Sequence, residues 1–220
     1  LKADNFDTDV IEVLRESNVE IKKQLMGLSR EDFSEVYLFF DYDAHQTNLG
    51  KAVNEDVIRQ MLESFDNETE NGKLYISYPM VEALRDYHPG KCGNGADCFA
   101  EIENLGRYKN VSATRALNPH FKEYDIDIWK DIIDVFAMKV SCLYKLSDTM
   151  EYAQYFEEVT PGQIYVMEVQ EAERQRVFVL SAFPEFLLDY FGVKLWKTSV
   201  KHTRNQMSEL ECRKNWFQKS

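Results

Sequence analysis

No stretch of the sequence approaches the roughly 18 consecutive apolar residues that a membrane-spanning helix needs, so we expect no membrane span. The N-terminal stretch LKADNFDTDV is acidic and polar, which is not the pattern of a secretory signal peptide. Hydrophobic residues still make up 44% and charged residues 29% of the 220 residues. This composition is typical of a soluble globular protein with one sizeable domain, or one domain with an appendage.

Basic residues are scarce: 26 of them face 38 acidic residues, which gives a formal net charge of −12. This balance argues against a protein that coats nucleic acid with a broad basic surface. It does not exclude an enzyme that holds nucleic acid locally through metal ions, because bound divalent cations reverse the local charge.

A disulfide-dense pattern is also absent. The sequence has four scattered cysteines, which are Cys92, Cys98, Cys142 and Cys212. Without a secretion signal, we expect reduced thiols and a cytoplasmic protein.

One glycine-rich loop contains His88, Cys92 and Cys98, which are candidate ligands of a structural Zn²⁺ ion. A fourth ligand would come from elsewhere, for example His120 or Cys142. The spacing is looser than that of paired C-x2-C motifs, and it favours unliganded cysteines over a zinc site.

The first 85 residues show alternating helix and strand patterns. Residues 8 to 27 have helical spacing with a break at Asn18, and a buried strand is predicted at Val36–Phe40. A helix at Asn54–Phe65 and a strand at Lys73–Pro79 follow, and a further helix begins after Pro79. Strands separated by helices predict parallel pairing in a layered α/β sheet.

The rest of the chain is predicted to be mainly helical. Residues 86–124 show no clean period and are predicted to form an irregular insertion. Within residues 125–220, a long helix begins at Asp125 or Asp127 and another at Thr160. A strand at Val177–Leu180 then precedes a helix that ends at Gly192. We therefore divide the chain into an α/β core at 1–85, the insertion at 86–124 and a helical C-terminal part with one strand at 125–220.

Two aspartates follow the first predicted strand directly, in the segment VYLFFDYDAH. Ligands bind at the carboxyl ends of the strands in parallel sheets, and Asp41 and Asp43 lie at such an end. Two carboxylates at this spacing can hold Mg²⁺ or Mn²⁺, completed by water and phosphate oxygens. The alternative is that both aspartates only begin a turn. His45, in the same loop, is interpreted as a hydrogen-bonding residue rather than a ligand.

A third carboxylate follows the second predicted strand, in the segment SYPMVEALRD. If the two strands are parallel neighbours, Glu82 lies at the same edge of the sheet as Asp41. The alternative is an ordinary first-turn acid that complements the helix dipole.

The order of these motifs resembles the Toprim fold: an apolar strand ending in Asp-x-Asp, a helix, and a strand leading into YPMVEAL. The likeness is to OLD-family nucleases and to bacterial abortive-infection proteins of the RloB and AbiL kinds, and it covers residues 30 to 90. It implies a Toprim-like parallel sheet flanked by helices and a metal-dependent nuclease of DNA or tRNA in anti-phage defence. Asp41, Asp43 and Glu82 would be its catalytic metal ligands, with Mg²⁺ or Mn²⁺ as cofactor.

Toprim domains begin with a strand that carries a glutamate, and no such strand precedes Asp41 here. Either this strand is missing from the chain, or the site is incomplete and the domain is an interaction subunit that docks a partner ATPase. A haloacid-dehalogenase-type phosphatase is a further alternative, with Asp41 as nucleophile and Asp43 as general acid/base. That family expects Thr or Val where His45 stands.

Several basic residues are candidates for contacts to a nucleic-acid backbone. These are Lys73, Arg85, Arg107, Lys109 and Arg115. On an acidic protein, such residues are more often ordinary surface charges paired with nearby carboxylates.

Overall fold

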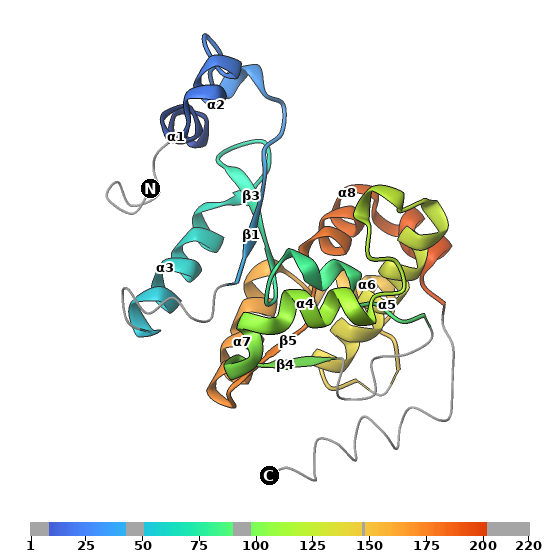
Figure 1. Cartoon of the computed structure of the whole chain (residues 1–220). Coiled ribbons are helices and arrows are strands. Elements are labelled where there is room, and N and C mark those ends of the chain that lie inside the picture. Colours follow the sequence, from blue (N-terminus) through green and yellow to red (C-terminus); the bar gives the residue numbers. More distant parts are fainter. Residues whose placement is uncertain (1–8, 43–50, 90–97, 147, 202–220) are drawn as a thin grey trace. The chain divides into compact units, whose positions relative to one another are not determined.

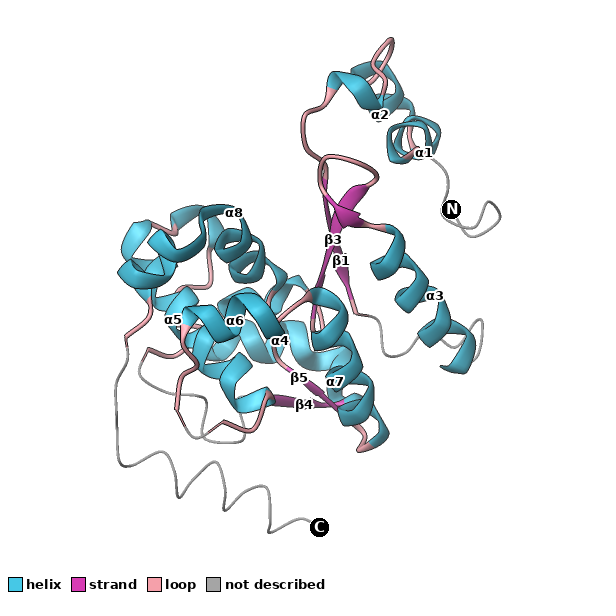
Figure 2. Cartoon of the chain, turned by 180° about the vertical axis from the view of Figure 1, so that it is seen from behind, coloured by secondary structure: helices cyan, strands magenta, loops and turns pink. Residues whose placement is uncertain are grey.

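The computed structural model describes residues 9–42, 51–89, 98–146 and 148–201, with the backbone alone for residues 51–56 (Figure 1). The chain divides into two compact units. The first comprises Leu1–Phe39 and Gln46–Tyr75, and the second comprises Phe40–His45 and Ile76–Ser220. Both contain helices and strands, as Figure 2 shows, so the predicted α/β class is confirmed in its coarse form. Within the described residues, no helix is long and apolar enough to cross a membrane.

The first unit opens with two short helices, α1 (Val10–Ser17) and α2 (Val19–Gln24). The predicted break at Asn18 is confirmed, because this residue has an extended backbone and its side chain accepts a hydrogen bond from the Glu20 N–H. A 3₁₀ turn at Arg30–Asp32 then leads into the first strand.

Three strands form the first sheet in the order β1-β3-β2. They are β1 (Tyr37–Asp41), β2 (Asp66–Asn67) and β3 (Gly72–Ser77), and helix α3 (Lys51–Ser64) lies between β1 and β2 in the chain. Backbone hydrogen bonds join Val36 to Lys73 near the start of β1 and Tyr42 to Ser77 after its end. The partners advance together along both strands, so β1 and β3 run parallel, as the sequence predicts.

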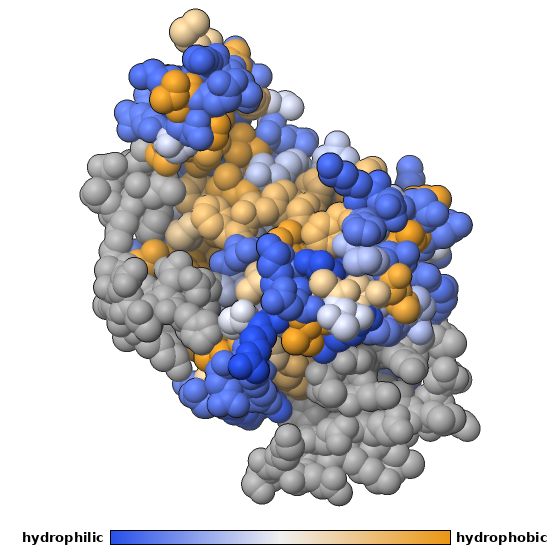
Figure 3. Space-filling model, in the orientation of Figure 1, coloured by the Kyte–Doolittle hydropathy of each residue, from blue (hydrophilic) through white to orange (hydrophobic). Residues whose placement is uncertain are grey.

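The predicted burial of the first strand is wrong in its second half. Phe39 is 38% exposed and Phe40 is 43% exposed, whereas every residue of β3 is buried or half-buried. The reason is the place of β1 at one end of the order β1-β3-β2, where, among the described strands, it has a neighbour on one side only. Figure 3 shows the resulting hydrophobic surface in the region of β1. The larger parallel sheet of the Toprim fold stays a prediction.

The second unit contains a two-stranded antiparallel sheet of β4 (Phe99–Glu101) and β5 (Arg176–Phe178). Leu180, just after β5, also forms an antiparallel bridge with Tyr78. Of the predicted strand at Val177–Leu180, Val177 and Phe178 therefore pair with β4, whereas Leu180 pairs with Tyr78. The buried ammonium of Lys139 on α5 (Ile126–Leu143) donates to the carbonyls of Asp86, at 2.7 Å, and Val179, at 3.0 Å. It thereby links the residue that follows β5 to Asp86, eight residues after Tyr78.

The predicted irregular insertion contains a regular helix, α4 (Leu105–Arg115), after a 3₁₀ turn at Ile102–Asn104. Its buried positions are Leu105, Tyr108 and Ser112, which have helical spacing. The sequence period is hidden because one of these positions is occupied by a serine, and because Val111 is exposed.

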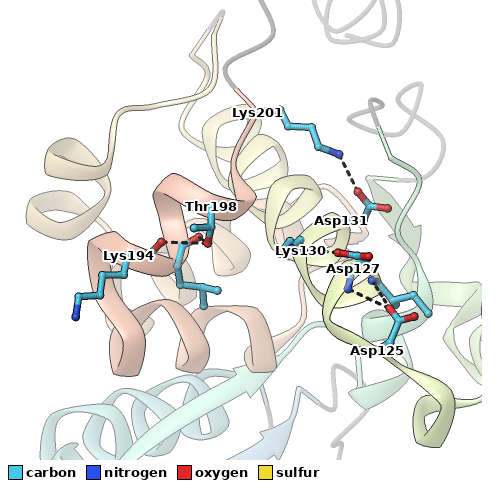
Figure 4. Close-up of polar contacts among 9 residues, drawn as sticks. Asp125, Asp127, Lys130, Asp131, Lys194, Thr198 and Lys201 are labelled. Carbon is cyan, nitrogen blue, oxygen red and sulfur yellow. Dashed lines mark hydrogen bonds and ion pairs between the residues drawn. The ribbon is translucent and has the colours of Figure 1, made fainter.

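The C-terminal helices confirm the predicted caps. After a 3₁₀ turn at Phe121–Glu123, they are α5 (Ile126–Leu143), α6 (Tyr152–Glu158), α7 (Pro161–Glu173) and α8 (Ala182–Ser199). The Asp125 carboxylate accepts from the N–H groups of Asp127 and Ile128 at the start of α5 (Figure 4). Thr160 caps α7 in the same way. Helix α5 packs against α8.

Helix α8 is interrupted at the predicted stop, Gly192, but it resumes and continues to Ser199. Gly192 has φ 61° and ψ −147°, a conformation that is essentially restricted to glycine. A Cβ atom at this position would lie 3.3 Å from the Tyr152 hydroxyl. Beyond the bend, Figure 4 shows the Thr198 hydroxyl donating to the Lys194 carbonyl, and Lys201 pairing with Asp131 on α5.

Candidate functional site

The candidate site lies within the second unit, where β1 ends and the 3₁₀ helix η3 (Val81–Arg85) begins. Asp41 is the last residue of β1. One of its carboxylate oxygens, Oδ1, accepts a 2.7 Å hydrogen bond from the Val81 N–H. Because Glu82 is the next residue, parallel pairing of β1 and β3 brings two carboxylates to the same end of the sheet.

Glu82 is buried, and two cationic side chains form ion pairs with the same oxygen of its carboxylate. Its Oε1 atom lies 3.4 Å from an Arg85 guanidinium nitrogen and 3.1 Å from the Lys109 ammonium. Arg85 comes from the same 3₁₀ helix, whereas Lys109 comes from α4. The sequence-predicted residues Glu82, Arg85 and Lys109 therefore lie together, and this ion-pair network accounts for the burial of a carboxylate.

The Asp41 carboxylate is electrostatically linked to this network. Partial burial is the largest influence and raises the pKa of Asp41 above its ordinary value. The hydrogen bond from Val81 opposes this effect, the negative charge of Glu82 adds to it, and the positive charge of Lys109 opposes it. A cation bound between the two acids would further relieve their mutual repulsion.

Carboxylates are the ligand type that a divalent cation such as Mg²⁺ prefers. Among the described residues, no hydrogen bond or ion pair reaches Asp41 Oδ2 or Glu82 Oε2. Mg²⁺ binds one or two carboxylates and completes its octahedron with water and phosphate oxygens, so two available oxygens are sufficient. Asp43 and His45 lie outside the described residues. Within those residues, no group of three or more His, Cys, Asp or Glu side chains is placed to bind a metal ion.

The helix that carries Lys109 is held in place by Asp86, whose contribution the sequence analysis missed. The buried Asp86 carboxylate accepts two hydrogen bonds from Arg115, at 2.7 and 2.5 Å, and one from the Tyr108 hydroxyl at 2.5 Å. Both donors lie on α4. The mixed segment ALRDYH gives no signal that Asp86 is buried, because its polar neighbours are typical of an exposed acid.

The other predicted basic contacts differ in their surroundings. Arg115 is bound by Asp86, which agrees with the paired-charge alternative for this residue. Arg107 is exposed on α4. Lys73 lies in the first unit, with its ammonium 5.8 Å from the centre of the Tyr75 ring.

The predicted zinc ligands are described only in part. His88 is half-buried and Cys98 is buried, with the Cys98 carbonyl accepting a 2.7 Å hydrogen bond from the Val179 N–H. Cys92 lies outside the described residues. The zinc interpretation stays a hypothesis.

A scan against protein-family models gives no match for this chain, and searches of curated proteins and of solved structures give none either.

Proposed function

We propose that the chain is a metal-dependent nuclease of DNA or RNA, with Asp41 and Glu82 as metal ligands and Asp43 as a third. The observation that supports this most directly is the convergence of two carboxylates that each keep one oxygen available. The resemblance to Toprim nucleases is the second support, and from it we carry over a role in anti-phage defence beside a partner ATPase.

The residues of the site have separate tasks in phosphodiester hydrolysis. A metal ion held by Asp41 and Glu82 would supply positive charge to the scissile phosphate and would make an attacking water more acidic. The Val81 N–H fixes the orientation of the Asp41 carboxylate, and the Arg85 guanidinium fixes that of Glu82. Lys109 adds a mobile positive charge beside the carboxylates, where a phosphate oxygen would lie.

The test is calorimetric titration of the full chain with Mg²⁺ and Mn²⁺. We expect binding in the wild type, and its loss in both Asp41→Asn and Glu82→Gln, because each change removes a ligand charge at nearly constant shape. Asp127→Asn is the matched control, since Asp127 is an exposed carboxylate on α5 and should leave metal binding unchanged. Cleavage of DNA and tRNA in Mn²⁺ should likewise be retained in the wild type and Asp127→Asn and be lost in Asp41→Asn and Glu82→Gln. Absence of metal binding by the wild type would contradict the proposal.

An interaction subunit is the second candidate function, and the exposure of Phe40 favours it. This aromatic side chain is 43% exposed on a strand at one end of the sheet order, a position suited to adding a partner strand. Such a subunit would tolerate Asp41→Asn in a defence assay and lose function on Phe40→Ser. The phosphatase alternative depends on Asp43, which lies outside the described residues.

A further inference from the structure

Glu82 Oε1 is shared by two cations that are held very differently. The Arg85 side chain is only 11% exposed, and its guanidinium carbon lies 5.3 Å from the centre of the Phe121 ring. The Lys109 side chain is 73% exposed. Arg85 is therefore fixed beside Glu82, whereas Lys109 can leave by rotating its own side chain into water.

The backbone of Lys109 is anchored through its helix, although its side chain is largely exposed. The preceding residue, Tyr108, is buried and donates to Asp86, and Arg115 at the end of the same helix donates to the same carboxylate. Movement is thus confined to the Lys109 side chain. Its ammonium can exchange between Glu82 and another acceptor within reach without a shift of α4.

From this contrast we propose that Lys109 is an exchangeable counter-ion. It neutralises Glu82 while the site holds no metal, and a divalent cation displaces it when it binds Asp41 and Glu82. This inference rests on the proposed metal-dependent function and adds to it a residue that competes with the metal. The displaced ammonium stays beside the site on a fixed helix, in a position to contact a phosphate oxygen of the substrate.

Displacement follows from elementary electrostatics. A doubly charged ion close to Glu82 attracts the carboxylate more strongly than a single ammonium does, and it repels that ammonium. Because the Lys109 side chain is largely exposed, water weakens its attraction to Glu82, and the competition reduces metal affinity only modestly, by about three- to fivefold.

The first test compares Mn²⁺ affinity by calorimetry in the full-length wild type, Lys109→Met and Lys109→Arg. Lys109→Met should bind Mn²⁺ about three- to fivefold more tightly than the wild type, since the competing cation is gone. Lys109→Arg retains the charge and should keep the wild-type affinity. Lys130→Met removes an ion pair remote from the site, the one between Lys130 and the exposed Asp127 on α5, and should have no effect.

The second test observes Lys109 directly in the protein without any substrate. After reductive methylation with ¹³C-formaldehyde, the Lys109 dimethylamino signal is assigned by its absence in Lys109→Arg. It should shift when Mg²⁺ is added to the wild type, and the shift should vanish in Asp41→Asn. The Lys130 signal should stay in place.

The outcomes separate the two proposals. Equal Mn²⁺ affinity in the wild type and Lys109→Met, with binding lost in Asp41→Asn, overturns the counter-ion role and leaves the metal site intact. A Lys109 signal that does not respond to saturating Mg²⁺ has the same meaning. No binding by the wild type overturns the proposed function and this inference together.

Discussion

Arg115 donates two hydrogen bonds to the carboxylate of Asp86, at 2.7 and 2.5 Å, and this ion pair attaches α4 to the segment that carries Glu82. The Asp86 side chain is 1% exposed and that of Arg115 is 27% exposed. The ion pair therefore stabilises the position of α4, and through α4 it also holds Lys109 against Glu82.

Replacement of Arg115 by Leu should lower the free energy of unfolding by about 2 kcal/mol. Removing one partner of a buried pair costs about 3–5 kcal/mol, and the partial exposure of Arg115 reduces that figure. Urea denaturation followed by circular dichroism measures the change. Arg107→Leu, on the same helix but exposed, should stay within about 0.5 kcal/mol of the wild type. If both variants are equally stable, the pair does not anchor α4.

Asp41→Ala and Asp41→Asn should differ in stability although both abolish the proposed metal site. Asparagine retains an oxygen that accepts from the Val81 N–H, whereas alanine leaves this donor without its acceptor. The alanine variant should be less stable by about 0.5–1 kcal/mol, the net value of one hydrogen bond. Denaturation midpoints of the two variants, measured without divalent cations, test this difference in stability. Identical midpoints would show that the hydrogen bond does not contribute.

Gly192→Ala should destabilise the second unit by about 1–3 kcal/mol, because alanine must adopt a conformation that essentially only glycine populates. The new Cβ atom would also lie close to the Tyr152 hydroxyl. Gly106→Ala is the matched control, because Gly106 lies in helix α4 and a Cβ atom added there would point into open space. This control should gain about 0.5–1 kcal/mol through helix propensity. If the thermal-unfolding midpoints of Gly192→Ala and Gly106→Ala are both lower than that of the wild type, the assignment of strain to Gly192 is contradicted.

The buried carboxyl group of Glu168 should make stability fall as the pH rises. One of its oxygens accepts from the Phe178 N–H at 2.9 Å, and burial, as the largest cause, raises the pKa of Glu168 well above its ordinary value of 4.5. Above pH 4.5 the unfolded chain therefore holds fewer protons at this residue than the folded chain does. The stabilising contribution is complete below that pH and is lost as the pH rises toward the folded-state pKa.

Glu168→Gln, which mimics the protonated acid, tests this dependence. The variant should remove a slope of up to about 1.4 kcal/mol per pH unit from the stability profile above pH 4.5. Urea denaturation of both proteins at a series of pH values measures it. Parallel stability profiles would mean that Glu168 titrates normally in the folded state.

Much of the fold could be predicted because it depends on local signals. The cap at Asp125 and the break at Asn18 are each set by residues within one helical turn. Helix α4 was missed because its pattern includes a buried serine, Ser112, which does not mark an apolar face. The exposure of Phe40 was also missed, since a hydrophobic run does not reveal which strand lies at the end of a sheet.

Only the two carboxylates of the site, those of Asp41 and Glu82, could be placed together from the sequence. Parallel pairing of neighbouring strands is enough to bring Asp41 and Glu82 to one edge, so their spacing in the sequence carried that information. The approach of Lys109 depends on how α4 packs against η3, which in turn depends on the buried contacts of Asp86. No periodicity encodes such a tertiary contact.

The bend at Gly192 gives the second unit an internal optical reporter. Beyond the bend, α8 places Trp196 at 1% exposure, with its ring 5.0 Å from that of Tyr155 and 5.7 Å from that of Tyr152 on α6. An indole in this dry, tyrosine-lined setting emits at short wavelength and receives excitation energy from its neighbours. Separation of α6 from the end of α8 would admit water to the ring and shift the Trp196 part of the emission to longer wavelength, which is resolved from Trp129 and Trp216 once those two residues are replaced by Phe.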